Sequence, residues 1–225
     1  LLIMYVPAPP SPVNEGFSEL FTAVIFVPGV TPVPEIYVSV DNTGSRQTGR
    51  HKALAYATLA SPFGFGETVN LTALHSEGTD YGKVAFMLPI GASGLELGAS
   101  SSYLEYDVIA KESKRLGLRG LSNSFALIAQ YPLIKNKLGK LTLTGNAEQK
   151  HFLNKSDAEG KTSDYDLKIF SILLSGDRSD GFLAGAVNNL SLDLGAGEVN
   201  LNGSNNEVSD QGGAHTQGAY TRLRW

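Results

Sequence analysis

Residues 83–90 read KVAFMLPI, and this stretch shows the pattern that decides the fold. Val84, Phe86 and Leu88 fall on alternate positions, so in an extended chain their side chains share one face, while Lys83 lies on the other. A period of two is typical of a strand with one apolar and one polar side. The same alternation recurs within residues 36–40, 95–97, 125–131, 141–144 and 167–169. We therefore expect an all-β protein.

Ten such stretches follow one another from residue 35 to residue 225. We predict strands at 35–41, 51–61, 67–76, 82–90, 94–107, 122–134, 140–153, 164–175, 181–194 and 215–225. The connections are long or moderate at 41–50, 77–81, 108–121, 154–163 and 195–214, and short at 62–66, 91–93, 135–139 and 176–180. A tilted strand needs about 9–11 residues to cross the hydrocarbon core, and membrane barrels alternate short turns with long loops. The pattern predicts a transmembrane antiparallel up-and-down β-barrel.

The composition narrows the function classes. The 225 residues carry a net charge of −4, which provides no global positive field for nucleic acid. No cysteine is present, which excludes disulfides, thiolate metal sites and cysteine nucleophiles. No stretch approaches about 18 consecutive apolar residues, so we expect no membrane-spanning helix. The first residues lack a basic region and a cleavage site, so we expect a fragment that does not begin with a signal peptide.

Residues 1–34 differ from the rest of the chain. We predict two strands there, at residues 1–6 and 21–27, joined by a proline-rich connection. Pro28, Pro32 and Pro34 follow, and proline is confined to turns and sheet edges. We interpret residues 1–34 as the last strands of a small domain plus a linker, and residues 35–225 as the N-terminal part of the barrel.

Two turns near the start of the barrel resemble those of a known family. Residues 40–49, VDNTGSRQTG, resemble the first barrel hairpin of the two-partner secretion transporters. These are outer-membrane proteins of the haemolysin-activator and filamentous-haemagglutinin transporter type. Residues 61–67, SPFGFGE, look like that family's turn between its second and third strands.

Further matches follow in the same order. Residues 88–91, LPIG, and the strand after them are similar to the family's fourth and fifth strands. Residues 130–135, QYPLIK, resemble its Tyr-Pro-Leu-Ile-Arg segment, with lysine at the arginine position, and residues 175–181 look like a further turn. The signature positions are Asp41, Asn42, Gly44, Arg46, Gly49, Pro62, Gly64, Gly66, Tyr131, Pro132, Lys135, Gly176, Asp177 and Asp180.

The resemblance implies a function and a location. Members of the family are pores of roughly sixteen strands, within the range of outer-membrane barrels, and they export a large partner protein, a haemolysin or an adhesin. It implies that residues 1–34 end a periplasmic POTRA-like domain and that this chain supplies about ten strands of a larger barrel. It also implies the outer membrane of a Gram-negative bacterium, no enzymatic activity and no cofactor. It further implies that the family's arginine-bearing loop motif would follow residue 225. Residues 118–120, LRG, look like this motif but lie too early in the chain, so we do not assign them its role.

Two sets of polar residues are candidates for contact with partners. Residues out of phase with the apolar face are expected to line a polar lumen: Glu96, Gln130, Thr142, Thr144, Asp166 and Lys168. Lys111, Lys114, Arg115 and Arg119 form a basic cluster in one long connection. Such a cluster fits a solvated loop, and it also fits contact with anionic lipopolysaccharide or with the exported protein.

Two other functions stay open at this point. A soluble all-β binding module, lectin-like or adhesin-like, would also have loops at both ends of its sheets. A carbohydrate-active enzyme is suggested only by the acidic pairs Glu105/Asp107 and Asp164/Asp166. The four histidines have no metal-ligand spacing.

Overall fold

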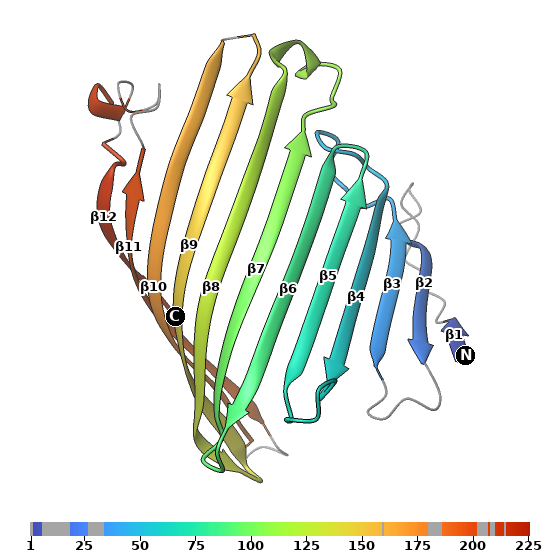
Figure 1. Ribbon diagram of the computed structural model, residues 1–225, viewed down its shortest axis with the longest axis vertical. Helices are drawn as coiled ribbons and strands as arrows, with labels where there is room; N and C mark the ends of the chain where they lie inside the picture. The colour runs from blue at the N-terminus through green and yellow to red at the C-terminus, as the bar shows by residue number, and fades with distance from the viewer. Residues whose placement is uncertain are drawn as a thin grey trace.

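The computed structural model shows a single layer of twelve strands, each antiparallel to its neighbour in chain order (Figure 1). It describes residues 2–5, 19–26, 34–158, 160–179, 186–201, 207, 210–213 and 215–225. Within these residues the first and last strands do not pair with each other, so the sheet is open. No helix in the described part of the chain is long and apolar enough to cross a membrane.

The strands follow the sequence closely. They are β1 (Leu2–Tyr5), β2 (Glu19–Phe26), β3 (Glu35–Asp41), β4 (Lys52–Ala60), β5 (Thr68–Ser76), β6 (Thr79–Ile90), β7 (Leu95–Asp107), β8 (Leu118–Asn136), β9 (Gly139–Ser156), β10 (Lys161–Ser179), β11 (Val187–Asn200) and β12 (Gly218–Arg224). The ten strands predicted between residues 35 and 225 correspond to β3–β12, which confirms an all-β antiparallel fold. The predicted pair within residues 1–34 is present as β1 and β2, and β2 pairs with β3 in the same sheet.

Several strands are longer than their apolar pattern. β8, β9 and β10 have 19, 18 and 19 residues, so the polar residues 154–156 and 161–163, predicted as a connection, are paired strand. β6 begins at Thr79, which reduces the predicted 77–81 connection to a turn at Glu77 and Gly78. These extensions are held by backbone pairing with a neighbouring strand, residues 161–163 with 154–156 of β9, and such pairing does not require apolar side chains. The alternation therefore marks the apolar part of each strand rather than its full length.

The sheet has one apolar face, which is exposed. Directly paired residues of neighbouring strands point to the same side of a sheet. One such row runs Phe86, Ala99, Leu127, Ala147, Phe170 and Ala196 across six strands. Its side, here called the apolar face, carries these exposed large side chains: Leu71, Val84, Ile90, Leu97, Tyr103, Phe125, Leu127, Tyr131, Ile134, Leu143, Phe170, Ile172, Leu190, Leu194 and Leu223.

The opposite side, here called the polar face, holds its polar groups in pairs. Asn70 Oδ1 accepts hydrogen bonds from Tyr56 Oη at 3.0 Å and from Thr58 Oγ1 at 2.9 Å. The hydroxyls of Ser102 and Ser124 lie 2.8 Å apart across β7 and β8. Three ion pairs lie on the same face: Lys52–Asp41, Lys150–Glu148 and Arg222–Asp193. The polar face is therefore lined by hydrogen-bonding and charged groups from β3 to β12.

The molecule has almost no hydrophobic core. Among the described residues, Ala126 and Leu201 are the only buried hydrophobic ones. A soluble sandwich buries the apolar sides of two sheets against each other, whereas the strands here form a single layer (Figure 1). The large side chains on its apolar side are exposed. An exposed apolar surface of this extent marks contact with a membrane or a partner.

The two ends of the sheet differ. One end, here called the loop end, carries the connections at 42–51, 77–78, 108–117, 157–160 and 201–217. The other, the turn end, carries those at 61–67, 91–94, 137–138 and 180–186. As predicted, the longest connections gather at one end. The exceptions are the two-residue turn at Glu77 and Gly78 and the four-residue connection at 157–160, which was expected to be long; both are shorter than the 61–67 connection at the turn end.

Candidate functional site

The apolar face forms a belt that runs diagonally across the sheet. On β5 the apolar side chains continue up to Ala73, and the next position on that face is His75, which is in register with Leu121 of β8. On β9 they end at Ala147, and the next position is Gln149, in register with Phe125. The boundary of the belt on the loop-end side is therefore four residues closer to the turn end on β9 than on β5.

The slope of the belt corresponds to the strand tilt of a membrane barrel. Four residues are about 13 Å along a strand, and four strand spacings are about 19 Å, so the boundary runs about 35° off the register. The lower boundary moves the same way: Val69 is the last residue of the belt on β5, whereas β9 extends it to Leu141. A belt of constant height across tilted strands produces this offset, and strands in outer-membrane barrels tilt by about 35–45°.

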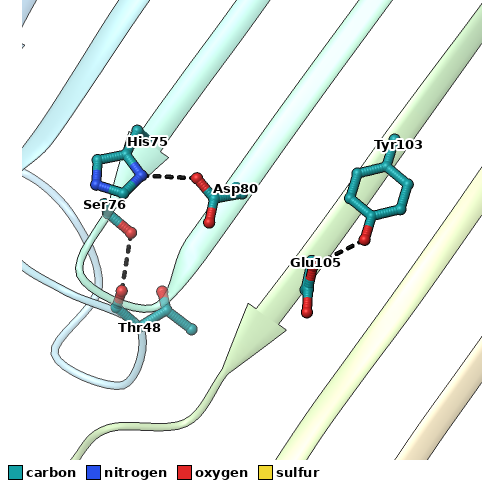
Figure 2. Close-up of polar contacts among 6 residues, drawn as sticks. All are labelled: Thr48, His75, Ser76, Asp80, Tyr103 and Glu105. Atoms are coloured by element: carbon teal, nitrogen blue, oxygen red, sulfur yellow. Dashed lines mark hydrogen bonds and ion pairs between the residues drawn. The ribbon is translucent and has the colours of Figure 1, made fainter.

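Polar pairs lie immediately beyond the belt at the loop end (Figure 2). His75 Nδ1 lies 2.6 Å from Asp80 Oδ1, and Tyr103 Oη donates to Glu105 Oε2 at 2.7 Å. Asp80 and Glu105 are register partners on β6 and β7. On β9, His151 Nδ1 lies 2.9 Å from an oxygen of Asp166. These groups are on the same side of the sheet as the belt, and they mark where its apolar character ends.

Backbone hydrogen bonds join three connections at the loop end into one cap. Gly78 N donates to Thr48 O at 2.7 Å, and Ile109 N donates to Gln47 O at 2.8 Å. Ser76 Oγ also donates to Thr48 O at 2.8 Å (Figure 2). The 42–51 loop therefore lies over the β5–β6 turn and reaches the β7–β8 connection. An alanine at Gly78 would place its Cβ 2.4 Å from Asp107 O, so the cap closes tightly around this glycine.

The first signature segment folds the 42–51 loop. Asp41, at the end of β3, accepts a hydrogen bond from Thr43 N at 2.8 Å and pairs with Lys52 at 3.5 Å. Gly44 N donates to Arg50 O at 2.9 Å. Gly49 has a φ of +117° and packs against the backbone of Glu77. Among the other signature positions in this loop, Asn42 is half-buried and Arg46 is exposed.

The second signature segment is built around a carboxylate that sequence reasoning missed. Glu67 is the largest fully buried side chain in the described part of the protein. Its carboxylate accepts hydrogen bonds from the backbone N–H groups of Phe63 and, at 2.8 Å, Phe65. Burial raises the pKa of Glu67, but the backbone N–H groups directed at the carboxylate outweigh it, so the pKa is below its usual value of 4.5.

Pro62, Gly64 and Gly66 form the turn around Glu67. Gly64 and Gly66 have φ values of +87° and +79°, a region that glycine adopts without strain. The sequence does hold a signal for this turn: residues 64–67 read GFGE, in which two glycines precede the glutamate.

The later signature positions lie where β8, β9 and β10 approach closely. Pro132 precedes a register shift in β8 and packs on Gly94, where a Cβ would lie 2.9 Å from Pro132 Cγ. At Gly176 a Cβ would lie 2.4 Å from Lys140 O, so glycine allows this approach. Tyr131 is on the apolar face. Lys135 of β8 and Asp177 of β10 are both register partners of Lys140 in β9, and all three lie on the polar face. Asp180 lies outside the described residues.

The six candidates for a polar lumen do not share one face. Glu96, Gln130, Thr142 and Thr144 lie on the polar face, since Gln130 is in register with both Glu96 and Thr144, and Thr142 follows the same alternation. Asp166 and Lys168 lie on the opposite side, beyond the belt, in register with His151 and Gln149.

The interpretation of residues 166–169 is thereby corrected. Leu167 and Ile169 lie on the polar face, and the apolar belt of β10 is formed by Phe170 and Ile172. Residues 166–169 lie between the belt and the loop end. In that part of the strand the apolar face also carries polar side chains.

The basic cluster and the acidic pairs have separate surroundings. Arg119 forms an ion pair with Asp157 at 3.0 Å, while Lys111, Lys114 and Arg115 are exposed around the short 3₁₀ helix η1 (Lys114–Leu116). The Glu105 carboxylate accepts a hydrogen bond from the Tyr103 hydroxyl, as shown in Figure 2. Asp164 and Asp166 both lie beside His151, at 3.7 Å and 2.9 Å. No group of three or more metal-ligating side chains occurs among the described residues.

Comparison with known proteins identifies the family. The family model described as "Haemolysin secretion/activation protein ShlB/FhaC/HecB" matches residues 27–219. A search of curated proteins gave no match. The matched segment covers β3–β11 and includes every signature position predicted from the sequence. The chain therefore belongs to this family, the two-partner secretion transporters, which are secretion pores of Gram-negative outer membranes rather than a class of enzymes.

Proposed function

We propose that this chain forms part of an outer-membrane β-barrel pore that secretes, and thereby activates, a large partner protein. The observation that carries the proposal is the pattern of exposure. Along β8 the odd-numbered side chains from Asn123 to Tyr131, mostly apolar, are exposed, and the even-numbered ones between them are buried or half-buried. In a soluble protein the apolar side chains of such a strand would be the buried ones. The observed exposure fits a sheet whose outer side meets lipid.

The polar face suits a passive conduit. Hydroxyls, amides and ion pairs on this face can hydrogen-bond to water and to an extended peptide. In a closed barrel this face lines the lumen, with Glu96, Gln130, Thr142 and Thr144 among its lining residues. Conduction of an unfolded chain through such a lumen needs neither a nucleotide nor a catalytic group, and folding outside the cell gives it direction.

The two ends face different compartments in this proposal. The loop end lies outside the cell, where Lys111, Lys114 and Arg115 can contact lipopolysaccharide phosphates or the emerging partner. The turn end lies in the periplasm. In this proposal residues 1–34 are the end of a POTRA-like domain, and the family match beginning at residue 27 supports a boundary near the linker. β2, within this region, pairs with β3 from Ile25 to Glu19 and thereby extends the edge of the sheet beside the first barrel strand.

Single-cysteine labelling tests the proposal, because the chain has no cysteine of its own. We expect cysteines at Leu127 and Leu143 in membranes to resist a water-soluble maleimide and to react with a lipid-soluble one. Cysteines at Gln130 and Thr144, on the same strands, should react with the water-soluble reagent. Equal labelling at all four sites, or a protein that stays monodisperse in solution without detergent, would refute a lipid-facing belt and favour a soluble binding module.

A further inference from the structure

The β4–β5 turn presents two phenyl rings at the turn end of the sheet. Phe63 is 68% exposed and Phe65 is 74% exposed. Together with Phe86, Leu88 and Pro89 they line a hollow of about 600 Å³. Phe86 and Leu88 belong to the apolar face, so the rings extend that face beyond the end of β5.

The turn is already folded in the geometry that exposes these rings. The Glu67 carboxylate accepts hydrogen bonds from the N–H groups of Phe63 and Phe65, the two residues whose side chains are exposed. Ser61 Oγ accepts a further bond from Gly66 N at 2.9 Å. Because the backbone is fixed, little conformational freedom is lost when the rings enter another phase.

The chemistry of the turn selects lipid as its partner. Residues 61–66 contain no charged side chain, and the adjacent carboxylate is buried beneath the turn. Two exposed aromatic rings that continue an apolar belt match the aromatic girdle at the edge of a membrane protein, where rings lie at the headgroup level. Nothing in residues 61–66 offers the charges that the rim of a protein–protein interface would use.

We propose that the β4–β5 turn is a lipid anchor: Glu67 holds Phe63 and Phe65 in the glycerol–acyl boundary of the periplasmic leaflet and fixes the depth of the sheet there. This inference rests on the proposed function, because it requires the belt to lie in a membrane.

Tryptophan fluorescence tests where the rings lie. In the full-length protein reconstituted into phosphatidylcholine vesicles, with Trp225→Phe, we expect Phe63→Trp and Phe65→Trp to emit at blue-shifted wavelengths. Lipid brominated near the headgroup should quench them more strongly than lipid brominated deep in the chains. Leu127→Trp serves as the belt control, and it should be quenched most by the deep bromines.

The controls separate the two proposals. If Leu127→Trp is quenched but both turn tryptophans emit like exposed indole, the anchor is refuted and the membrane belt stands. Burial of the turn tryptophans without quenching would identify a periplasmic protein domain as the occupant and would also refute the anchor. If Leu127→Trp is not quenched either, the proposed function itself fails.

A second pair of variants tests the role of Glu67. Glu67→Gln keeps the size of the side chain but places an amide donor against a backbone N–H, so we expect the Phe65→Trp emission to shift to the red and its quenching to fall. Glu77→Gln removes the same charge from an exposed turn at the loop end and should change neither. Heat-modifiable gel mobility checks that both variants fold. Unchanged quenching in a folded Glu67→Gln variant would contradict the assignment.

Discussion

Leu127 shows at the scale of one residue what the apolar face requires. It is 55% exposed and lies in the middle of the belt, between Ala99 and Ala147. An arginine there would have to enter the hydrocarbon, so we expect Leu127→Arg to lower the free energy of unfolding in lipid by about 2–4 kcal/mol. Denaturant unfolding in vesicles, followed by gel mobility, measures this difference.

Gln130 provides the matched control on the same strand. It lies on the polar face, half-buried, and in register with Glu96 and Thr144. Gln130→Arg should therefore cost far less than Leu127→Arg. Thr142 is unsuitable for this purpose because it is only 6% exposed, so an arginine there would be crowded whatever the surrounding phase. Equal losses at Leu127 and Gln130 would contradict the assignment of the faces.

Glu67 gives the β4–β5 turn a defined response to acid. A carboxyl whose pKa is lowered by folding stabilises the turn fully above its unfolded pKa, and that stability is lost as the pH falls through the folded pKa. We expect Phe65→Trp emission in vesicles to stay constant from about pH 8 to about pH 5 and to shift only below the usual value of 4.5. Glu67→Gln should abolish the transition, and a midpoint above 4.5 would contradict the direction of the pKa shift.

At the scale of elements, the loop-end cap depends on a glycine. Gly78→Ala would bring Cβ within 2.4 Å of Asp107 O and 3.1 Å of Ile109 Cγ2, so the β5–β6 turn would have to move away from its neighbours. We expect the amide of Ile109 to lose its protection from hydrogen exchange by about tenfold, in line with a cost of about 1.4 kcal/mol.

Gly82 offers the control for this prediction. It lies on β6 on the apolar face, and an added Cβ there meets nothing within 4 Å. Gly82→Ala should leave the exchange of the cap amides unchanged. Equal protection of Ile109 in the Gly78→Ala and wild-type proteins would mean that the three connections are not coupled.

The strands themselves could largely be predicted from the sequence, but their lengths and one phase could not. Alternation marks the part of a strand that has one apolar and one polar side, so it disappears where a strand leaves the belt. This is why β10 was placed with Leu167 on the apolar side, whereas the register assigns that side to Phe170 and Ile172. Polar strand ends such as residues 154–156 are held by backbone pairing, which leaves no side-chain pattern to detect.

The signature turns were located from sequence, but their mechanics were not. Gly64 and Gly66 could be recognised as turn residues because glycine favours positive φ. The role of Glu67 depends on the turn folding back over its own carboxylate, which no local periodicity encodes. Likewise, the contact between Gln47 and Ile109 crosses two intervening strands, and only the assembled sheet brings them together.

At the scale of the whole molecule, the diagonal belt predicts unequal depths for residues that are in register. Ala73 of β5 and His151 of β9 share one row of the sheet, yet Ala73 lies in the belt and His151 beyond it. Because the strands tilt, we expect a spin label at Ala73 to be reached by oxygen dissolved in the bilayer, and one at His151 by a water-soluble nickel chelate. Equal depths at the two sites would mean that the strands run parallel to the membrane normal.

The order of the strands also has a kinetic consequence. Every strand pairs only with its neighbours in the chain, from β1 to β12. Each pairing therefore closes only a short loop, and the sheet can grow by adding one hairpin at a time without waiting for distant segments to meet. During such growth the newest strand always presents unpaired N–H and C=O groups, which recruit other chains as readily as the correct successor. Assembly is then limited less by the search for partners than by the protection of that advancing edge until the next strand arrives.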